Sequence, residues 1–135
     1  MKFILSILVA VAIIFGLFFA FSSPAVETQS TTAAEKPTTF QVITSDIESG
    51  AKLIDVRTTE EYAEGYIQGA ELLPLADIQS GSYPQVDKAT KLYVYCRSGN
   101  RSAQATSLLR TAGYTNVVDL GGYDDVVSLG GKMVK

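Results

Sequence analysis

Cys96 is the only cysteine of the chain, and Arg97 and Arg101 both follow it within five positions. A free thiol has a pKa of about 8.5 and becomes a good nucleophile only when it ionises. The two arginines and the N–H groups of a tight loop would favour the thiolate, and would also favour an anionic substrate beside it. We therefore predict that Cys96 is a catalytic nucleophile. The predicted substrate-binding residues are Arg97, Ser98, Gly99, Asn100, Arg101 and Ser102.

A simpler interpretation of Cys96 must be weighed against this one. A lone cysteine is more often a small buried hydrophobe than a nucleophile. Here two arginines, a glycine and three other polar residues occupy the next six positions, which is not typical of an inert cysteine. Gly99 in addition suits a backbone turn with positive φ. The surroundings of Cys96 therefore favour the reactive interpretation.

The composition excludes several kinds of chemistry. The chain has no histidine, so neither a cysteine–histidine pair nor an imidazole base can form within it. A single cysteine excludes an intrachain disulfide, a Cys-x-x-Cys redox pair and a thiolate zinc site. We expect neither a metal nor a cofactor. The net charge of −3, without a basic run, argues against general nucleic-acid binding.

The residues around Cys96 predict how it is positioned. Residues 91–95 form a short apolar and aromatic run that is typical of a buried strand, and this run stops at Cys96. Residues 103–110 are rich in alanine and leucine and predict a helix. The thiol would then lie where a strand ends and face the N-terminus of a helix. Open α/β sheets bind their ligands at such positions.

The segments on either side alternate between strand-like and helix-like patterns. The other expected strands are 40–43, 52–57, 70–75 and 116–120. Capping boxes at 45–48 and 58–61 predict the starts of two helices, and we expect further helical segments within 76–86 and 123–129. This alternation predicts an α/β domain with a roughly five-stranded parallel sheet and helices on both faces.

The N-terminal part of the chain differs in character from this domain. Residues 3–21 are almost entirely apolar, which predicts a signal peptide or a transmembrane anchor within residues 1–22. Residues 23–39 are rich in Ser, Thr, Ala and Pro and predict a flexible linker to a domain at 40–135. We therefore expect an exported protein, periplasmic or extracellular, that is held at the membrane through residues 3–21 if the leader is not cleaved.

Several stretches of the predicted domain resemble a single-domain rhodanese. They are Leu53–Arg57, Glu60–Tyr62, Gly65–Ala70, Tyr93–Ser102 and Leu120–Tyr123. The resemblance implies a small rhodanese-like domain and a sulfurtransferase activity. Such proteins take a sulfane sulfur from thiosulfate or a similar donor onto the loop cysteine as a persulfide, and pass it to cyanide or to a thiol. The implied partners are a small anionic sulfur donor and a thiol acceptor.

Four residues outside the loop bear on this resemblance. Asp55 and Arg57 end a neighbouring strand, and we expect either a supporting role at the site or a structural salt bridge. The family often has histidine where Tyr66 stands and tryptophan where Val126 stands. Both departures leave the nucleophile intact and bear on local packing and partner recognition.

Two alternative functions follow from the same residues. Related phosphatases have a Cys-x5-Arg loop, whereas Cys96 and Arg101 form Cys-x4-Arg, which predicts a loop too tight for a phosphate ester. The other alternative is a non-catalytic sulfur carrier or a partner-binding module at the extracytoplasmic membrane surface. Rhodanese-like domains that only bind commonly lack the cysteine, so the presence of Cys96 favours catalysis.

Overall fold

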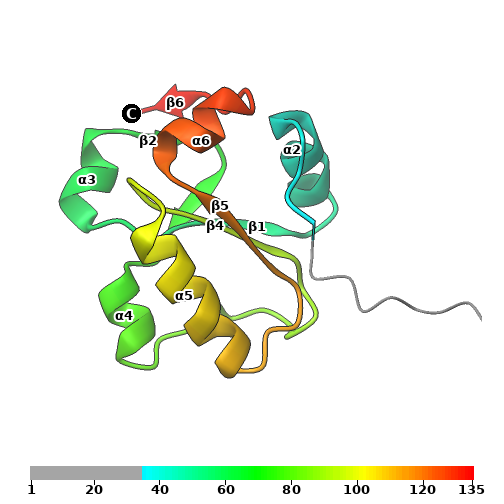
Figure 1. Ribbon diagram of the computed structural model, residues 1–135, viewed down its shortest axis with the longest axis vertical. Coiled ribbons are helices and arrows are strands. Elements are labelled where there is room, and N and C mark those ends of the chain that lie inside the picture. The colour runs from blue at the N-terminus through cyan, green and yellow to red at the C-terminus, as the bar shows by residue number, and fades with distance from the viewer. Residues whose placement is uncertain (1–34) are drawn as a thin grey trace, which may run out of the picture. The chain divides into compact units, whose positions relative to one another are not determined.

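The computed structural model describes residues 35–135 of the chain (Figure 1). The expected leader at residues 1–22 and most of the expected linker at 23–39 lie outside the described residues. Within the described residues, the first element is α2, which begins at Phe40. Within residues 35–135, no helix combines the length and the apolar character that a membrane crossing requires.

A parallel sheet of four strands forms the centre of the domain (Figure 1). Its strands are β1 (Lys52–Asp55), β3 (Ala70–Leu72), β4 (Leu92–Tyr95) and β5 (Val117–Gly121). Their order across the sheet is β3-β1-β4-β5, and all neighbouring strands pair in parallel. The predicted α/β class is therefore confirmed, with four strands in the parallel sheet instead of about five.

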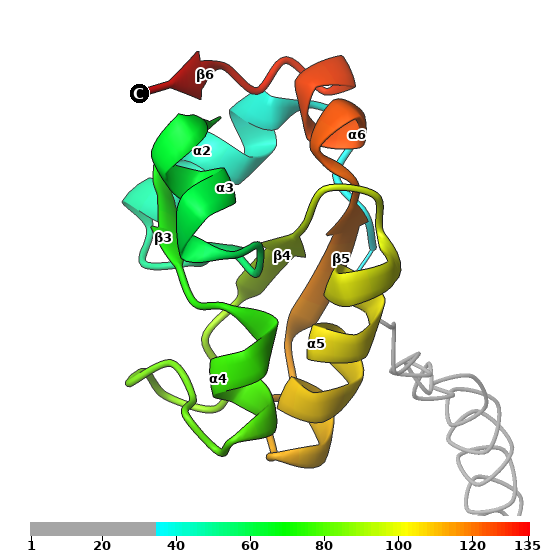
Figure 2. The ribbon, with the colours of Figure 1, turned by 90° about the vertical axis from the view of Figure 1, so that its left-hand side faces the viewer.

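Helices cover both faces of this sheet. On one face, α2 (Phe40–Glu48) and α6 (Tyr123–Ser128) pack on a core that includes Tyr93 and Tyr95. On the other face, α4 (Leu75–Gln79) and α5 (Asn100–Thr111) lie side by side (Figure 2). The side chains of β4 alternate between the two faces, and all of them are buried. Cys96 continues this alternation and belongs to the core on the α4 and α5 side.

The predicted strand at 40–43 is wrong, because these residues form the first part of α2. Phe40, Ile43 and Ile47 follow a helical spacing and face the core, with Ile43 fully buried. The expected capping box at 45–48 therefore lies inside the helix, whose N-cap is Thr39. A stretch of four residues with three apolar side chains fits one turn of a buried helix as well as it fits a short strand.

A second, two-stranded sheet was not expected from the sequence. It pairs β2 (Tyr66–Ile67) with β6 (Met133–Val134) in antiparallel fashion. Strands of two residues have no periodicity that could be recognised. The remaining helix, α3 (Thr59–Glu64), starts at the expected capping box of Thr58 and Glu61. It ends at Gly65, directly before β2.

Candidate active site

Cys96 lies directly after β4 and begins a loop of residues 96–102, hereafter the cysteine loop, that runs into the first turn of α5. The backbone N–H of Gly99 donates a hydrogen bond to Cys96 Sγ at 3.0 Å. Gly99 has φ of 93°, in the left-handed region that favours glycine, and is the N-cap of α5. The predicted placement of the thiol, at the end of a strand and against a helix N-terminus, is what the structure shows.

The surroundings of Cys96 act on its pKa in two opposite directions. Burial of the fully buried side chain raises the pKa of the thiol. The backbone N–H and the hydroxyl of the nearby Ser102, and the N–H groups of Ser98 and Gly99, lower it, and the N–H of Gly99 does so through its hydrogen bond to Sγ. These groups together outweigh the effect of burial, so the pKa of Cys96 lies below its ordinary value. The cysteine loop itself thus stabilises the thiolate, without any histidine.

This balance predicts the pH at which the thiol reacts. We expect the alkylation rate of Cys96 to rise with a midpoint below the value of about 8.5 that is typical of a free thiol. The measurement is the rate of iodoacetamide modification as a function of pH, followed by mass spectrometry. A Ser102→Ala variant loses a hydroxyl that contributes to the lowering of the pKa and that donates to the carbonyls of Gly99 and Gly121, so its midpoint should shift upward. A wild-type midpoint above that of a free thiol would contradict a preformed thiolate.

The cysteine loop is held in place by the corner between β5 and α6. Ser98 and Gly122 form an antiparallel bridge, and the N–H of Tyr123 donates to the carbonyl of Arg97 at 3.1 Å. A Cβ atom at Gly122 would lie 3.0 Å from the carbonyl oxygen of Arg97, so the close approach of the two segments depends on glycine. This anchoring role of Gly122 was not predicted, although Leu120–Tyr123 is one of the rhodanese-like stretches.

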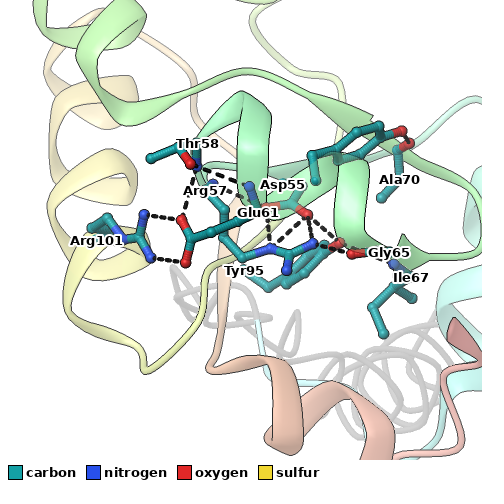
Figure 3. A network of polar contacts seen from close by, with 10 residues as sticks. Asp55, Arg57, Thr58, Glu61, Gly65, Ile67, Ala70, Tyr95 and Arg101 are labelled. Atoms are coloured by element: carbon teal, nitrogen blue, oxygen red, sulfur yellow. Dashed lines mark hydrogen bonds and ion pairs between the residues drawn. The ribbon is translucent and has the colours of Figure 1, made fainter. Parts of the chain in front are cut away.

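Arg101 points to Glu61 on α3 and binds its carboxylate with two nitrogens, at 2.6 and 2.8 Å (Figure 3). The same carboxylate accepts the N–H of Thr58 at 3.0 Å, which completes the capping box of α3. This arrangement ties the start of α3 to the start of α5. Arg101 is thus engaged with a protein carboxylate, and its predicted contact with substrate stays a prediction. Glu61 was not among the predicted site residues.

The ion pair of Glu61 predicts a pH dependence of stability. The hydrogen bond from Arg101 lowers the pKa of Glu61 to about 2. The pKa of Glu61 is lower in the folded protein than the value of about 4.5 in the unfolded chain. The ion pair therefore stabilises the fold fully above pH ~4.5, and this stabilisation is lost as the pH falls toward 2. We expect Glu61→Gln to lower the free energy of unfolding at neutral pH, and to do so progressively less below pH ~4.5.

Urea unfolding at several pH values measures this difference. A suitable control is Glu64→Gln, since Glu64 is exposed and makes no ion pair within residues 35–135. If the two variants have the same pH profile, the Glu61–Arg101 pair contributes nothing to stability.

Asp55 and Arg57 form a buried ion pair beside the cysteine loop (Figure 3). The nearest oxygen and nitrogen are 2.6 Å apart, and Arg57 also donates to the carbonyl of Gly65 at 2.8 Å. The hydroxyl of Tyr95 donates to Asp55 at 2.6 Å and accepts the N–H of Ile67 at 3.1 Å. Burial and the hydrogen bond to Asp55 raise the pKa of Tyr95, which keeps it a neutral donor. The structure shows the salt bridge, which is one of the two roles expected for Asp55 and Arg57, and Tyr95 is a member of this network that the sequence did not predict.

A pocket of about 590 Å³ opens next to the cysteine loop, hereafter the loop-side pocket. Its lining includes Arg57, Arg97, Ser98, Tyr123, Asp124 and Met133. The exposed Arg97 makes no ion pair within the described part of the chain, whereas Arg57 and Arg101 are both paired. Arg97 is therefore the cation of the loop that is free to bind an anion entering this pocket.

The two departures from the rhodanese pattern have defined positions. The ring of Tyr66 stacks on that of Tyr62, with centroids 4.1 Å apart and an interplanar angle of 9°. Val126 is fully buried in the core on the α2 and α6 face. Neither contacts the sulfur through a hydrogen bond.

The sequence of this chain matches one known protein family over most of the described residues. The model of the rhodanese-like domain matches residues 39–129. The chain belongs to the rhodanese-like domain family. This match covers β1 to α6 and includes the cysteine loop, in agreement with the resemblance seen in the sequence.

Two curated rhodanese relatives are named as sulfurtransferases. The chain is 39% identical over 62 residues to thiosulfate sulfurtransferase PspE of Escherichia coli, covering 45% of this chain and 60% of that protein. It is 35% identical over 77 residues to human thiosulfate:glutathione sulfurtransferase, covering 47% of this chain and 67% of that protein. A solved structure described as a rhodanese with anions, from E. coli, superposes with a TM-score of 0.54 at 35% identity, covering 64% of this chain and 99% of that one. These matches confirm the kinship with sulfurtransferases and the rhodanese-like fold.

Proposed function

We propose that this rhodanese-like protein is a sulfurtransferase that moves a sulfane sulfur from thiosulfate, or a similar anionic donor, through a Cys96 persulfide to a thiol or to cyanide. The observation that carries this proposal is the hydrogen bond from the N–H of Gly99 to Cys96 Sγ, in a loop that lowers the pKa of the thiol. The two relatives named as sulfurtransferases support it.

The first step needs a thiolate and an electrophilic sulfur. The Cys96 thiolate attacks the outer sulfur of thiosulfate, a new S–S bond forms, and the S–S bond within thiosulfate breaks. Sulfite leaves with the electron pair of that bond, and the outer sulfur stays on Cys96 as a persulfide anion. No proton has to be removed in this step when the thiolate is preformed, so the absence of histidine is no obstacle. The loop N–H groups can stabilise the negative charge throughout.

The second step regenerates the thiolate. A thiolate acceptor attacks the outer sulfur of the persulfide, and the bond between that sulfur and Cys96 Sγ breaks. Its electron pair returns to Cys96, which leaves as a thiolate. The same N–H groups that stabilise the resting thiolate make Cys96 a good leaving group here.

Arg97 is the proposed ligand of the donor oxygens. We expect Arg97→Ala to raise the donor KM about tenfold, which corresponds to the loss of one exposed charge-assisted hydrogen bond. Because its side chain is exposed, the free energy of unfolding should change by less than about 0.5 kcal/mol. Arg97→Lys keeps the charge and should recover part of the affinity. Steady-state kinetics with thiosulfate and cyanide measures the effect, and an unchanged donor KM for Arg97→Ala would remove this assignment.

We also propose that the protein is exported and that residues 3–21 anchor it if they are not cleaved. This proposal is supported by the apolar run of the sequence alone. Fractionation of cells that produce the full chain, with a mass measurement of its N-terminus, tests it. A cytosolic protein with an intact N-terminus would overturn it.

Mass spectrometry of the protein after incubation with thiosulfate tests the proposed activity. Cys96 should gain one sulfur, roughly 32 Da, and should lose it again on addition of cyanide or a thiol. A gain of mass without repeated turnover would indicate a sulfur carrier. No gain with thiosulfate or with any other persulfide donor would indicate a partner-binding module and overturn the proposal.

A further inference from the structure

Met133 is the most exposed large hydrophobic side chain among residues 35–135, with an exposed fraction of 65%. An exposed apolar residue is not unusual by itself. Met133, however, lines the loop-side pocket together with Arg97 and Ser98 of the cysteine loop. Met133 is therefore exposed in a pocket that borders the cysteine loop.

Two contacts fix Met133 at this place near the C-terminus. In the β2–β6 sheet its backbone pairs with Ile67. Its side chain lies over Gly65, where an added Cβ atom would come within 2.9 Å of Met133 Sδ. The carbonyl of Gly65 in turn accepts the hydrogen bond from Arg57. Met133 is thus packed against the buried Asp55–Arg57 network and does not belong to a free chain end.

The lining of the pocket contains charged groups of both signs. Arg97, in the cysteine loop, is the unpaired cation, whereas Glu64 and Asp124 are exposed carboxylates in the same lining and make no ion pair within residues 35–135. An anionic donor is attracted by Arg97. The same lining also offers the apolar surfaces of Met133 and Tyr123 to the carbon body of an acceptor. A thioether is an adaptable apolar surface for such a body.

We propose that Met133 determines acceptor specificity: its side chain contacts the carbon substituent of the thiol acceptor, and it selects thiols with an uncharged, apolar substituent. The proposal rests on the sulfurtransferase function proposed above. In the acceptor step the incoming thiolate forms a bond to the outer sulfur of the persulfide, while the bond from that sulfur to Cys96 Sγ breaks. The substituent that follows the attacking sulfur then lies in the loop-side pocket, against Met133.

Single-turnover discharge of the persulfidated full chain tests this inference. The acceptors are 2-phenylethanethiol, 2-mercaptoethanol, 3-mercaptopropionate and cyanide, with rates corrected for the thiolate fraction of each thiol. We expect the wild type to prefer 2-phenylethanethiol, and Met133→Gln to lower that preference about fivefold while cyanide discharge stays unchanged. This expected change is smaller than the roughly 10- to 200-fold discrimination between substrates that one methylene gives in an enclosed pocket, because Met133 is largely exposed.

Two further variants make the result specific. Met133→Leu keeps an apolar surface and should retain the preference. Val42→Gln alters another exposed hydrophobic residue, on α2 with an exposed fraction of 43%, and should behave as the wild type. The inference is overturned if Met133→Gln slows all acceptors equally, if the preference is unchanged, or if Met133→Leu loses it. A wild type that forms no persulfide overturns the proposed function instead.

Discussion

A Cys96→Ser variant is expected to form no persulfide and to lower thiocyanate production by at least about 10⁴-fold. A serine hydroxyl is not ionised at neutral pH, and the N–H groups of the cysteine loop cannot lower its pKa enough to replace a thiolate. The chain has no second cysteine and no histidine, so no other side chain can take over as nucleophile or activate the serine. The measurements are the mass shift with thiosulfate and the steady-state formation of thiocyanate.

The same variant should remain folded, which makes the loss of activity interpretable. Serine is close to cysteine in size, and its oxygen can accept the hydrogen bond from Gly99 that the sulfur accepts now. We therefore expect the free energy of unfolding to change by no more than about 1 kcal/mol. Thiocyanate formation by a folded Cys96→Ser protein at a rate near that of the wild type would exclude Cys96 as the sulfur-carrying residue.

The cysteine loop could be predicted from the sequence because all of its determinants are local. A buried strand, a thiol, a glycine with positive φ and the start of a helix follow each other within a few residues. The stabilisation of the thiolate by loop N–H groups follows from this order alone. Ser102, Ser98 and Gly99 are the larger causes of the lowered pKa of Cys96, and Arg101, although it binds Glu61, also interacts favourably with the charge of the Cys96 thiolate.

The partners of the site residues could not be predicted in the same way. Glu61 and Arg101 are 40 positions apart, and so are Asp55 and Tyr95. Periodicity shows which face of a strand a residue occupies, but not which residue of another segment it meets. Glu61 had a visible local role in the capping box of α3, and this role gave no sign of its second contact.

The errors in secondary structure have the same origin. Phe40–Ile43 is a helix because its side chains pack on a core made by the distant strands β1 and β4, which a four-residue window does not contain. β2 and β6 exist only as a pair, and their partner residues are separated by more than half of the described chain. Met133, on which the proposed acceptor specificity rests, reaches the site only through this pairing.

The largest effect on stability is expected from Asp55→Ala. It would leave the Arg57 guanidinium, whose side chain is only 9% exposed, without its counterion, and would leave the Tyr95 hydroxyl without its acceptor. Breaking one side of a buried ion pair costs about 3–5 kcal/mol in free energy of unfolding. Urea denaturation measures this loss. The matched control is Glu71→Gln, since the Lys52–Glu71 pair is 36% and 58% exposed and should contribute at most about 1 kcal/mol.

Asp55→Ala and Tyr95→Phe together also separate a structural role of the network from a role in catalysis. Tyr95→Phe removes the hydrogen bond to Asp55 and the acceptor of the Ile67 N–H but keeps the ion pair, so it should cost about 1–3 kcal/mol. Arg57 lines the loop-side pocket, and a role in binding the donor would appear as a raised donor KM in folded Asp55→Ala protein but not in Tyr95→Phe. We expect the two folded variants to have the same donor KM as the wild type, because in the wild type the Arg57 guanidinium binds Asp55 and the carbonyl of Gly65 and so contributes nothing to donor binding. A donor KM raised tenfold in Asp55→Ala alone would instead assign Arg57 to substrate binding.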